Sequence, residues 1–154
     1  MYFHRKRKFL DIDVISGTSD GEISIWNLSN GCLMNKIPLH TEAVSALRLV
    51  PGERAVSAAR DGDVCITDLT VSHEVYRKHL AEPVSCLWWD SSTLWLGDAG
   101  GSLLQWGVLT VTQKDRRIIH DGAINCIYLD ERSRVLVTGG TDRDVKEWRI
   151  LDSS

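Results

Sequence analysis

The sequence predicts an all-β protein assembled from four similar repeats, and three observations carry that prediction. A short apolar strand, a tight acidic or glycine-rich turn and a second strand follow one another four times, at residues 14–26, 55–67, 94–106 and 136–148. The last positions of these copies, residues 26, 67, 106 and 148, are 41, 39 and 42 residues apart. No segment shows a sustained period of 3.6 residues, so helix should be scarce.

Each full repeat adds an inner strand before this pair and an outer strand after it. In the second repeat, apolar side chains alternate from Val44 to Leu49, and Pro51 and Gly52 then form a turn. The corresponding inner strands are expected at 84–89 and 124–129, and the outer strands near 32–37, 74–78 and 112–118. The total is about 14 strands, divided as three, four, four and three.

A repeat of about 40–45 residues with a glycine-bearing turn and a terminal Trp resembles the WD40 repeat, whose four strands form one blade of a β-propeller. The resemblance implies a basic segment at 1–13 and repeats within 14–154, at about 14–38, 39–78, 79–119 and 120–151. The first inner strand would fall on the cationic residues 3–8, and few residues follow Trp148 for a last outer strand. We therefore expect four blades that belong to a larger, seven-bladed propeller.

Composition points to a folded domain without a membrane anchor. The 154 residues are 43% hydrophobic and 25% charged, which is ordinary for a globular protein. No apolar run approaches the roughly 20 residues of a membrane span, and the apolar step after the first basic residues is too short for a signal peptide. We expect a cytoplasmic protein.

The net charge is −3, although four cations are clustered in His4–Lys8. Such a cluster could bind acidic lipid, RNA or an importin, but it has no interleaved aromatic residues. A solvated terminus is the preferred interpretation, and no specific nucleic acid is expected.

The four cysteines form no Cys-x-x-Cys pair, so neither a metal site nor a cofactor is expected. Cys86 and Cys126 occupy the place that Ala46 has in the second repeat. We expect them to be buried, reduced thiols that behave as small apolar residues.

A His, a hydroxyl, an acid and a Trp recur with the repeat. The residues of this set are His120, Thr138, Asp142 and Trp148 in the fourth repeat, His40, Ser57 and Asp61 in the second, and Ser16, Asp20 and Trp26 in the first. One interpretation is a hydrolase that uses His120 with Asp142 and a hydroxyl nucleophile. The recurrence of the set favours a different interpretation, because a hydrolase of this kind would need a separate active site in each of several blades. The WD40 resemblance implies a structural hydrogen-bond network, and we predict that the chain is not an enzyme.

The third repeat departs from this pattern. Leu96 stands in place of the hydroxyl and Gly100 in place of the acid, so the network is expected to be lost there. Aromatic residues are concentrated in this repeat instead. Trp88 is a candidate partner-binding residue, with core packing as the default interpretation.

A finer resemblance links the chain to BEACH-domain adaptors associated with neutral sphingomyelinase activation. The similar segments are 15–18, 25–26, 33–34, 37–38 with His40, 89–90, 122–127 and 138–143. The resemblance implies a non-catalytic signalling scaffold with protein partners and with peripheral membrane association through the full-length protein. A generic WD40 adaptor of another complex is the alternative. The end blades should expose open edges and apolar residues, including Ile23, Ile25, Val135 and Val145, so the isolated chain is expected to self-associate.

Overall fold

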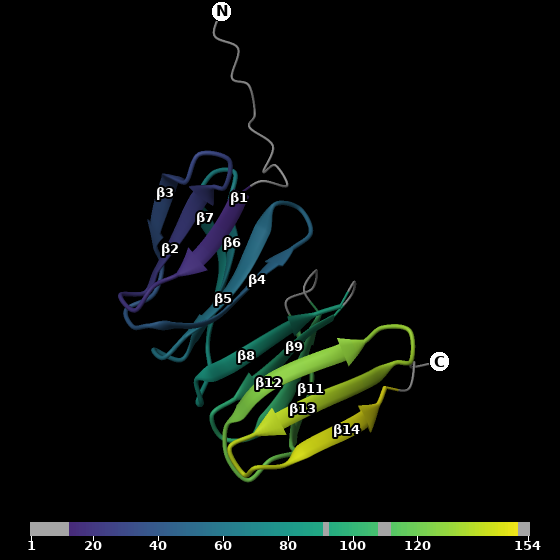
Figure 1. Cartoon of the computed structure of the whole chain (residues 1–154). Coiled ribbons are helices and arrows are strands. Elements are labelled where there is room, and N and C mark those ends of the chain that lie inside the picture. Colours follow the sequence, from purple (N-terminus) through teal and green to yellow (C-terminus); the bar gives the residue numbers. More distant parts are fainter. Residues whose placement is uncertain (1–12, 91–92, 108–111, 151–154) are drawn as a thin grey trace, which may run out of the picture. The chain divides into compact units, whose positions relative to one another are not determined.

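The computed structural model describes residues 13–90, 93–107 and 112–150, which form fourteen strands in four antiparallel sheets (Figure 1). The all-β prediction and the division into three, four, four and three strands are confirmed. None of the described residues is helical, so this part of the chain holds no helix that could span a membrane. The inner strand expected at residues 3–8 lies outside the described residues.

Each sheet is one blade, and the chain divides into two compact units between His79 and Leu80. The first unit holds blade one, with β1 (Asp13–Gly17), β2 (Glu22–Asn27) and β3 (Cys32–Pro38), and blade two, with β4 (Val44–Val50), β5 (Arg54–Ala59), β6 (Asp63–Asp68) and β7 (His73–His79). The second unit holds blade three, with β8 (Val84–Trp89), β9 (Thr93–Asp98), β10 (Ser102–Gly107) and β11 (Thr112–Ile118), and blade four, with β12 (Ile124–Asp130), β13 (Val135–Gly140) and β14 (Val145–Arg149).

Every blade is a meander in which consecutive strands pair, and its irregularities repeat with the sequence. In blades one to three a β-bulge immediately precedes the terminal position, at Ile25/Trp26, Ile66/Thr67 and Gln105/Trp106. A second bulge recurs on the inner strands of blades two to four, at residues 44/46, 84/86 and 124/126. Bulges increase the local twist of a strand, so the sheets inherit the same shape from the same repeat positions.

The core of the first unit lies between blades one and two. Ile23 and Ile25 of β2 pack in one cluster with Ala55 and Cys65 of blade two. Ile23 is 0% exposed, so the prediction that Ile23 and Ile25 lie on an open outer face was wrong. Side chains alternate along a strand, and this alternation directs both isoleucines toward blade two.

The core of the second unit lies between blades three and four. Trp95 of β9 packs with Ile124, Ile127 and Leu136 of blade four, and partly buried side chains of blade three, Cys86 and Trp88 among them, cover the cluster.

The repeat-related cysteines of this unit differ in burial. Cys86 lies with its Sγ 3.2 Å from the carbonyl oxygen of Ile124, and burial raises the pKa of its thiol to about 12. Cys126 is exposed, so the prediction of a buried thiol was wrong there. Blade four lies against Cys86, whereas no described residue covers the same face of blade four.

The tight turns between the middle strands explain three glycines of the repeat. Gly21, Gly62 and Gly101 have φ values of 83° to 85°, and Arg143 has 69° at the fourth equivalent position. A Cβ on Gly21 would collide with the carbonyl oxygen of His40, and one on Gly101 with that of His120. The backbone that starts the next blade therefore lies directly on the turn.

Candidate functional site

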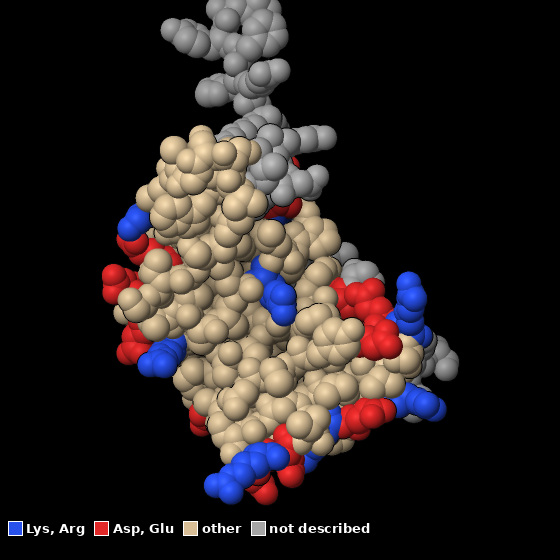
Figure 2. Space-filling model, in the orientation of Figure 1, with Lys and Arg blue, Asp and Glu red and all other residues tan. Residues whose placement is uncertain are grey.

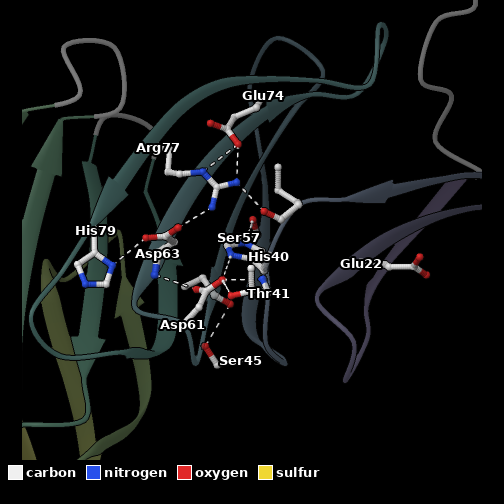
Figure 3. Close-up of polar contacts among 12 residues, drawn as sticks. Glu22, His40, Thr41, Ser45, Ser57, Asp61, Asp63, Glu74, Arg77 and His79 are labelled. Atoms are coloured by element: carbon white, nitrogen blue, oxygen red, sulfur yellow. Dashed lines mark hydrogen bonds and ion pairs between the residues drawn. The ribbon is translucent and has the colours of Figure 1, made fainter.

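The second blade brings its predicted His, hydroxyl and acid together (Figure 3). His40 Nε2 lies 2.8 Å from Ser57 Oγ, and its Nδ1 lies 3.3 Å from Asp61 Oδ2. The Asp61 carboxylate also accepts the backbone N–H groups of Thr41 and Asp63, both at 2.9 Å. Burial lowers the pKa of His40, and this effect outweighs the opposing effect of the Asp61 carboxylate. The neutral imidazole is therefore favoured.

The fourth blade assembles the complete set. His120 Nδ1 lies 2.9 Å from Asp142 Oδ2, and its Nε2 lies 2.9 Å from Thr138 Oγ1. The indole N–H of Trp148 donates to the same Oγ1 at 3.3 Å. Desolvation by itself would raise the pKa of Asp142, but hydrogen bonds from the backbone of Asp144 and from His120 bring it down to about 2.

The first blade brings together only part of its set. The indole N–H of Trp26 donates to Ser16 Oγ at 2.9 Å. Asp20 is exposed and accepts from the hydroxyl of Ser19 at 3.3 Å. The backbone N–H of Glu22 in this turn donates instead to Thr18 Oγ1 at 3.1 Å.

The geometry resembles a nucleophilic triad, but the hydroxyls are inaccessible. Ser57 and Thr138 are 0% exposed and His120 is 1% exposed. A nucleophile must approach the reacting atom of a substrate to about 3–3.5 Å. No substrate can do so at these oxygens without opening the sheet, so the arrangement favours the structural interpretation over the hydrolase.

The third blade keeps one half of the network by another route. Leu96 is buried in place of the hydroxyl, and the Nε1 of Trp106 has no hydrogen-bond partner among the described residues. The hydroxyl and acid of the set are absent from this blade, as expected, and its turn is capped by an acid outside the repeat position. Asp98 Oδ1 accepts the backbone N–H of Ser102 at 2.7 Å and that of Gly100 at 3.0 Å. Ser102 corresponds to Asp63 and Asp144, whose N–H groups are capped in blades two and four.

A repeated ion pair was missed by the sequence analysis. A cation on the outer strand pairs with an acid near the turn in three blades: Lys36 with Glu22 at 2.9 Å, Arg77 with Asp63 at 2.5 Å, and Arg116 with Asp98 at 3.2 Å. Each cation lies ten residues after the terminal position of its repeat, at 26, 67 and 106. That spacing was available in the sequence as a signal.

Among the described residues of blade four, a cation of β14 makes an equivalent contact. Arg77 donates to the carbonyl oxygen of Leu39 at 2.5 Å, and Lys146 of β14 donates to the equivalent carbonyl of Ile119 at 2.6 Å. The residue before the network histidine thus keeps a cationic partner in both blades.

In blade two the cation lies within a larger surface network, which Figure 3 also draws. Arg77 bonds Glu74 at 2.6 Å, and His79 Nδ1 lies 2.9 Å from Asp63. Desolvation acts to raise the pKa of Asp63, but the hydrogen bonds from Arg77 and His79 hold it below its usual value.

A groove of about 260 Å³ opens in the second unit beside β14. Its floor is apolar and aromatic, and its rim is charged. The floor residues include Trp95, Leu103, Ile119, Leu136 and Trp148, and the rim residues include Asp115, Arg117 and Arg149. Trp88 is not among the lining residues. It is half-buried, and its ring lies edge-on to Tyr128 with centroids 5.1 Å apart.

One edge of β14 lines up with this groove. In the sheet of blade four, β14 pairs only with β13 among the described residues. The bonds from Ile150 N to Arg134 O and from Gly140 N to Asp144 O show that even-numbered residues of β14 point their backbone groups toward β13. The N–H and C=O groups of Val145, Glu147 and Arg149 therefore face the unpaired edge.

Residues 113–149, which run from β11 to the end of β14, match the family model described as WD domain, G-beta repeat. This segment of the chain is therefore similar to a WD40 repeat. The chain is 28% identical over 149 residues to the Periodic tryptophan protein 2 homolog of Caenorhabditis elegans, a match that covers 90% of the chain and 16% of that protein. It is 26% identical over 148 residues to Autophagy-related protein 16 of Arabidopsis thaliana, covering 90% of the chain and 28% of that protein. It thus spans only a small part of either relative.

Solved structures share the fold. The computationally designed Ika4 protein has a TM-score of 0.81 and 25% identity, with 93% of this chain and 88% of that chain covered. The designed Ika8 protein has a TM-score of 0.80 and 25% identity, with 92% and 44% covered. A chain of the Mitotic Checkpoint Complex has a TM-score of 0.81 at 19% identity, with 90% and 44% covered, which shows the fold alone.

Proposed function

We propose that this chain is a non-catalytic WD40 protein-interaction scaffold and that the groove beside β14 is one of its partner sites. The observation that carries the proposal is the combination of an unpaired strand edge with an apolar groove and an arginine-bearing rim. An extended peptide can add to such an edge, where main-chain hydrogen bonds supply affinity and side-chain contacts supply specificity.

The groove suggests what such a peptide would look like. Its backbone would bond the outward N–H and C=O groups of Val145, Glu147 and Arg149. Every second side chain would face the aromatic floor beside Trp148, because side chains alternate along a strand. Arg117, whose side chain is 76% exposed, and the exposed Arg149 favour acidic residues at the ends of the segment.

Charge on the visible surface supports a protein partner over nucleic acid. Figure 2 shows Lys and Arg side chains interspersed with Asp and Glu on the face drawn, without a continuous basic field. Binding to phosphate backbones depends on concentrated positive charge.

Selection from a display library of random peptides tests the groove. We expect enriched sequences with alternating apolar residues and acidic flanks. Arg149→Glu should shift the enriched flanks toward Lys and Arg. Arg132→Glu, in the exposed turn before β13, is the matched control and should leave the enrichment unchanged. Identical selections by wild type and Arg149→Glu would contradict the proposal.

On the finer level, we propose that the chain is the WD40 part of a cytoplasmic BEACH-type adaptor linked to neutral sphingomyelinase activation, with membrane association supplied by other parts of that protein. The support is the similarity of segments such as 122–127 and 138–143. The transcript upstream of Met1 tests this. A reading frame that continues into a BEACH domain is expected, and any other upstream domain would assign the chain to another WD40 adaptor.

A further inference from the structure

Two faces of each blade have distinct roles within the units. The forward face points toward the next blade in sequence, and the rear face points toward the previous one. In the first unit, Ile23 on the forward face of blade one packs in one cluster with Ala55 on the rear face of blade two. In the second unit, Trp95 on the forward face of blade three packs with Leu136 on the rear face of blade four. The same repeat positions thus form the blade contact in both units.

The forward face of blade four is open, and its apolar residues flank the exposed Glu147, which pairs directly with Val137. Val145, which corresponds to the fully buried Ile23, is 77% exposed. Tyr128 is 56% exposed, and Cys126 is also exposed. Val135 and Val137 are half-buried on the same face. Contiguous apolar surface of this kind usually marks an interaction site.

The rear face of blade one is also open. Val14 is 41% exposed, although its counterpart in blade four, Leu136, is 1% exposed. Trp26 is 36% exposed, and Leu33, which is paired directly with Trp26 across β2 and β3, is 42% exposed. Directly paired residues lie on the same face of a sheet, so these three side chains form one apolar surface.

We infer that the forward face of blade four binds the rear face of blade one of a second copy of this chain. The contact would repeat the packing of blade three on blade four, because the repeat positions that meet are the same. The likeness to Ika8 supports a second copy as the occupant: this chain matches 44% of that chain with a TM-score of 0.80, so the fold also occurs in a chain with room for two such segments.

The two surfaces differ, so the contact is heterologous. Each copy offers one forward and one rear face to other copies. Association stops at a small closed ring if the rotation closes, and continues to larger assemblies if it does not. The inference does not depend on the peptide groove.

The mass of the purified chain tests the inference, measured by light scattering over a range of concentrations. We expect a species of at least twice the 17.3 kDa chain mass. Val145→Asp should shift the population to monomer. Ile118→Asp is the matched control, because Ile118 is also 77% exposed but lies on the outer strand of blade three. Circular dichroism should show unchanged β structure in both variants.

Mixing two variants distinguishes this heterologous contact from a symmetric one. Leu33→Asp on blade one should also yield monomer. An equal mixture of Val145→Asp and Leu33→Asp chains retains one intact pair of faces, so it should form a heterodimer, whereas neither variant associates alone.

Thiol labelling gives an independent readout. Cys126 should become protected from a maleimide as concentration rises, while the exposed Cys32 stays reactive. A wild-type chain that stays monomeric, association that survives Val145→Asp, or a Leu33→Asp chain that associates normally would each overturn the inference.

Discussion

The carboxylate of Asp98 accepts the backbone N–H of Ser102 at 2.7 Å and thereby caps the turn of blade three from a position two residues earlier than in blades two and four. In blade four the same amide belongs to Asp144 and is capped by Asp142 at 3.1 Å. One turn geometry is therefore reached from two sequence positions. The acid at the usual position is not required when a neighbouring carboxylate can reach the amide.

Asp98→Ala should lower the free energy of unfolding by about 1–3 kcal/mol, because it leaves buried N–H groups unsatisfied. Asp98 is 2% exposed, and Arg116 would lose its carboxylate partner while keeping its hydrogen bond to Ser102 Oγ. Urea unfolding measures the effect. Asp20→Ala removes an exposed acid from the turn of blade one and should cost clearly less. Equal losses of stability in the two variants would show that the hydrogen bonds of Asp98 stabilise the chain no more than an exposed acid does.

Gly101→Ala should destabilise the chain by about 1–3 kcal/mol, the usual range for a residue held in a strained backbone conformation. The added methyl group would meet the carbonyl oxygen of His120 at a positive φ. Arg143→Gly, at the equivalent position of blade four, should change stability by less than about 1 kcal/mol. Thermal melting of both variants tests the contrast. A Gly101→Ala chain that melts like wild type would show that the turn can move away from the next blade.

His120→Ala should reduce stability by about 1–3 kcal/mol without removing any hydrolytic activity. The reason is that Thr138, its hydrogen-bond partner, is fully buried and loses that bond. Urea unfolding and hydrolysis of a simple nitrophenyl ester, run side by side, give the two readouts. Loss of ester hydrolysis at unchanged stability would instead establish the hydrolase.

The first unit should lose stability as the pH falls below about 6.5, the ordinary pKa of His. Burial lowers the pKa of His40 in the folded chain. In the interval between the folded and unfolded pKa values the unfolded chain binds the additional proton, so acid favours unfolding there. Unfolding free energies of wild type and His40→Gln at several pH values should converge as the pH drops through this interval. Parallel curves would assign the pH dependence to other groups.

The Asp142 carboxylate should contribute a separate acid step. Its pKa is about 2 in the folded chain, against an ordinary value of 3.8. Its stabilisation is complete above the ordinary value and is lost as the pH falls toward 2. Asp142→Asn should therefore flatten the pH dependence of unfolding below pH 4, while Asp121→Asn, an exposed neighbour, should not.

Local patterns were sufficient to predict the strands. Alternation with period two and turns rich in glycine or aspartate depend on neighbouring residues only. The expected strands at 84–89 and 112–118 coincide with β8 and β11, and the expected inner strand at 44–49 is one residue shorter than β4. The recurrence of His, hydroxyl and acid likewise predicted which side chains meet in blades two and four.

Such local patterns could not predict which side chains reach across a turn. Asp98 lies outside the acid position of the repeat, and only the folded turn shows that its carboxylate reaches Ser102. The groove is a further case, because Trp95, Arg117 and Trp148 come from three strands and two blades.

By itself the sequence determined the repeat, the strands and the turns of this protein, because each depends on interactions within one blade. Only the tertiary structure decided which face of each blade is covered. Ile23 and Val145 occupy the same repeat position on strands of similar pattern, yet one is 0% and the other 77% exposed. Burial depends on the neighbour that packs against a surface. The residues of a strand determine which of its sides is apolar, but not whether another blade packs against that side.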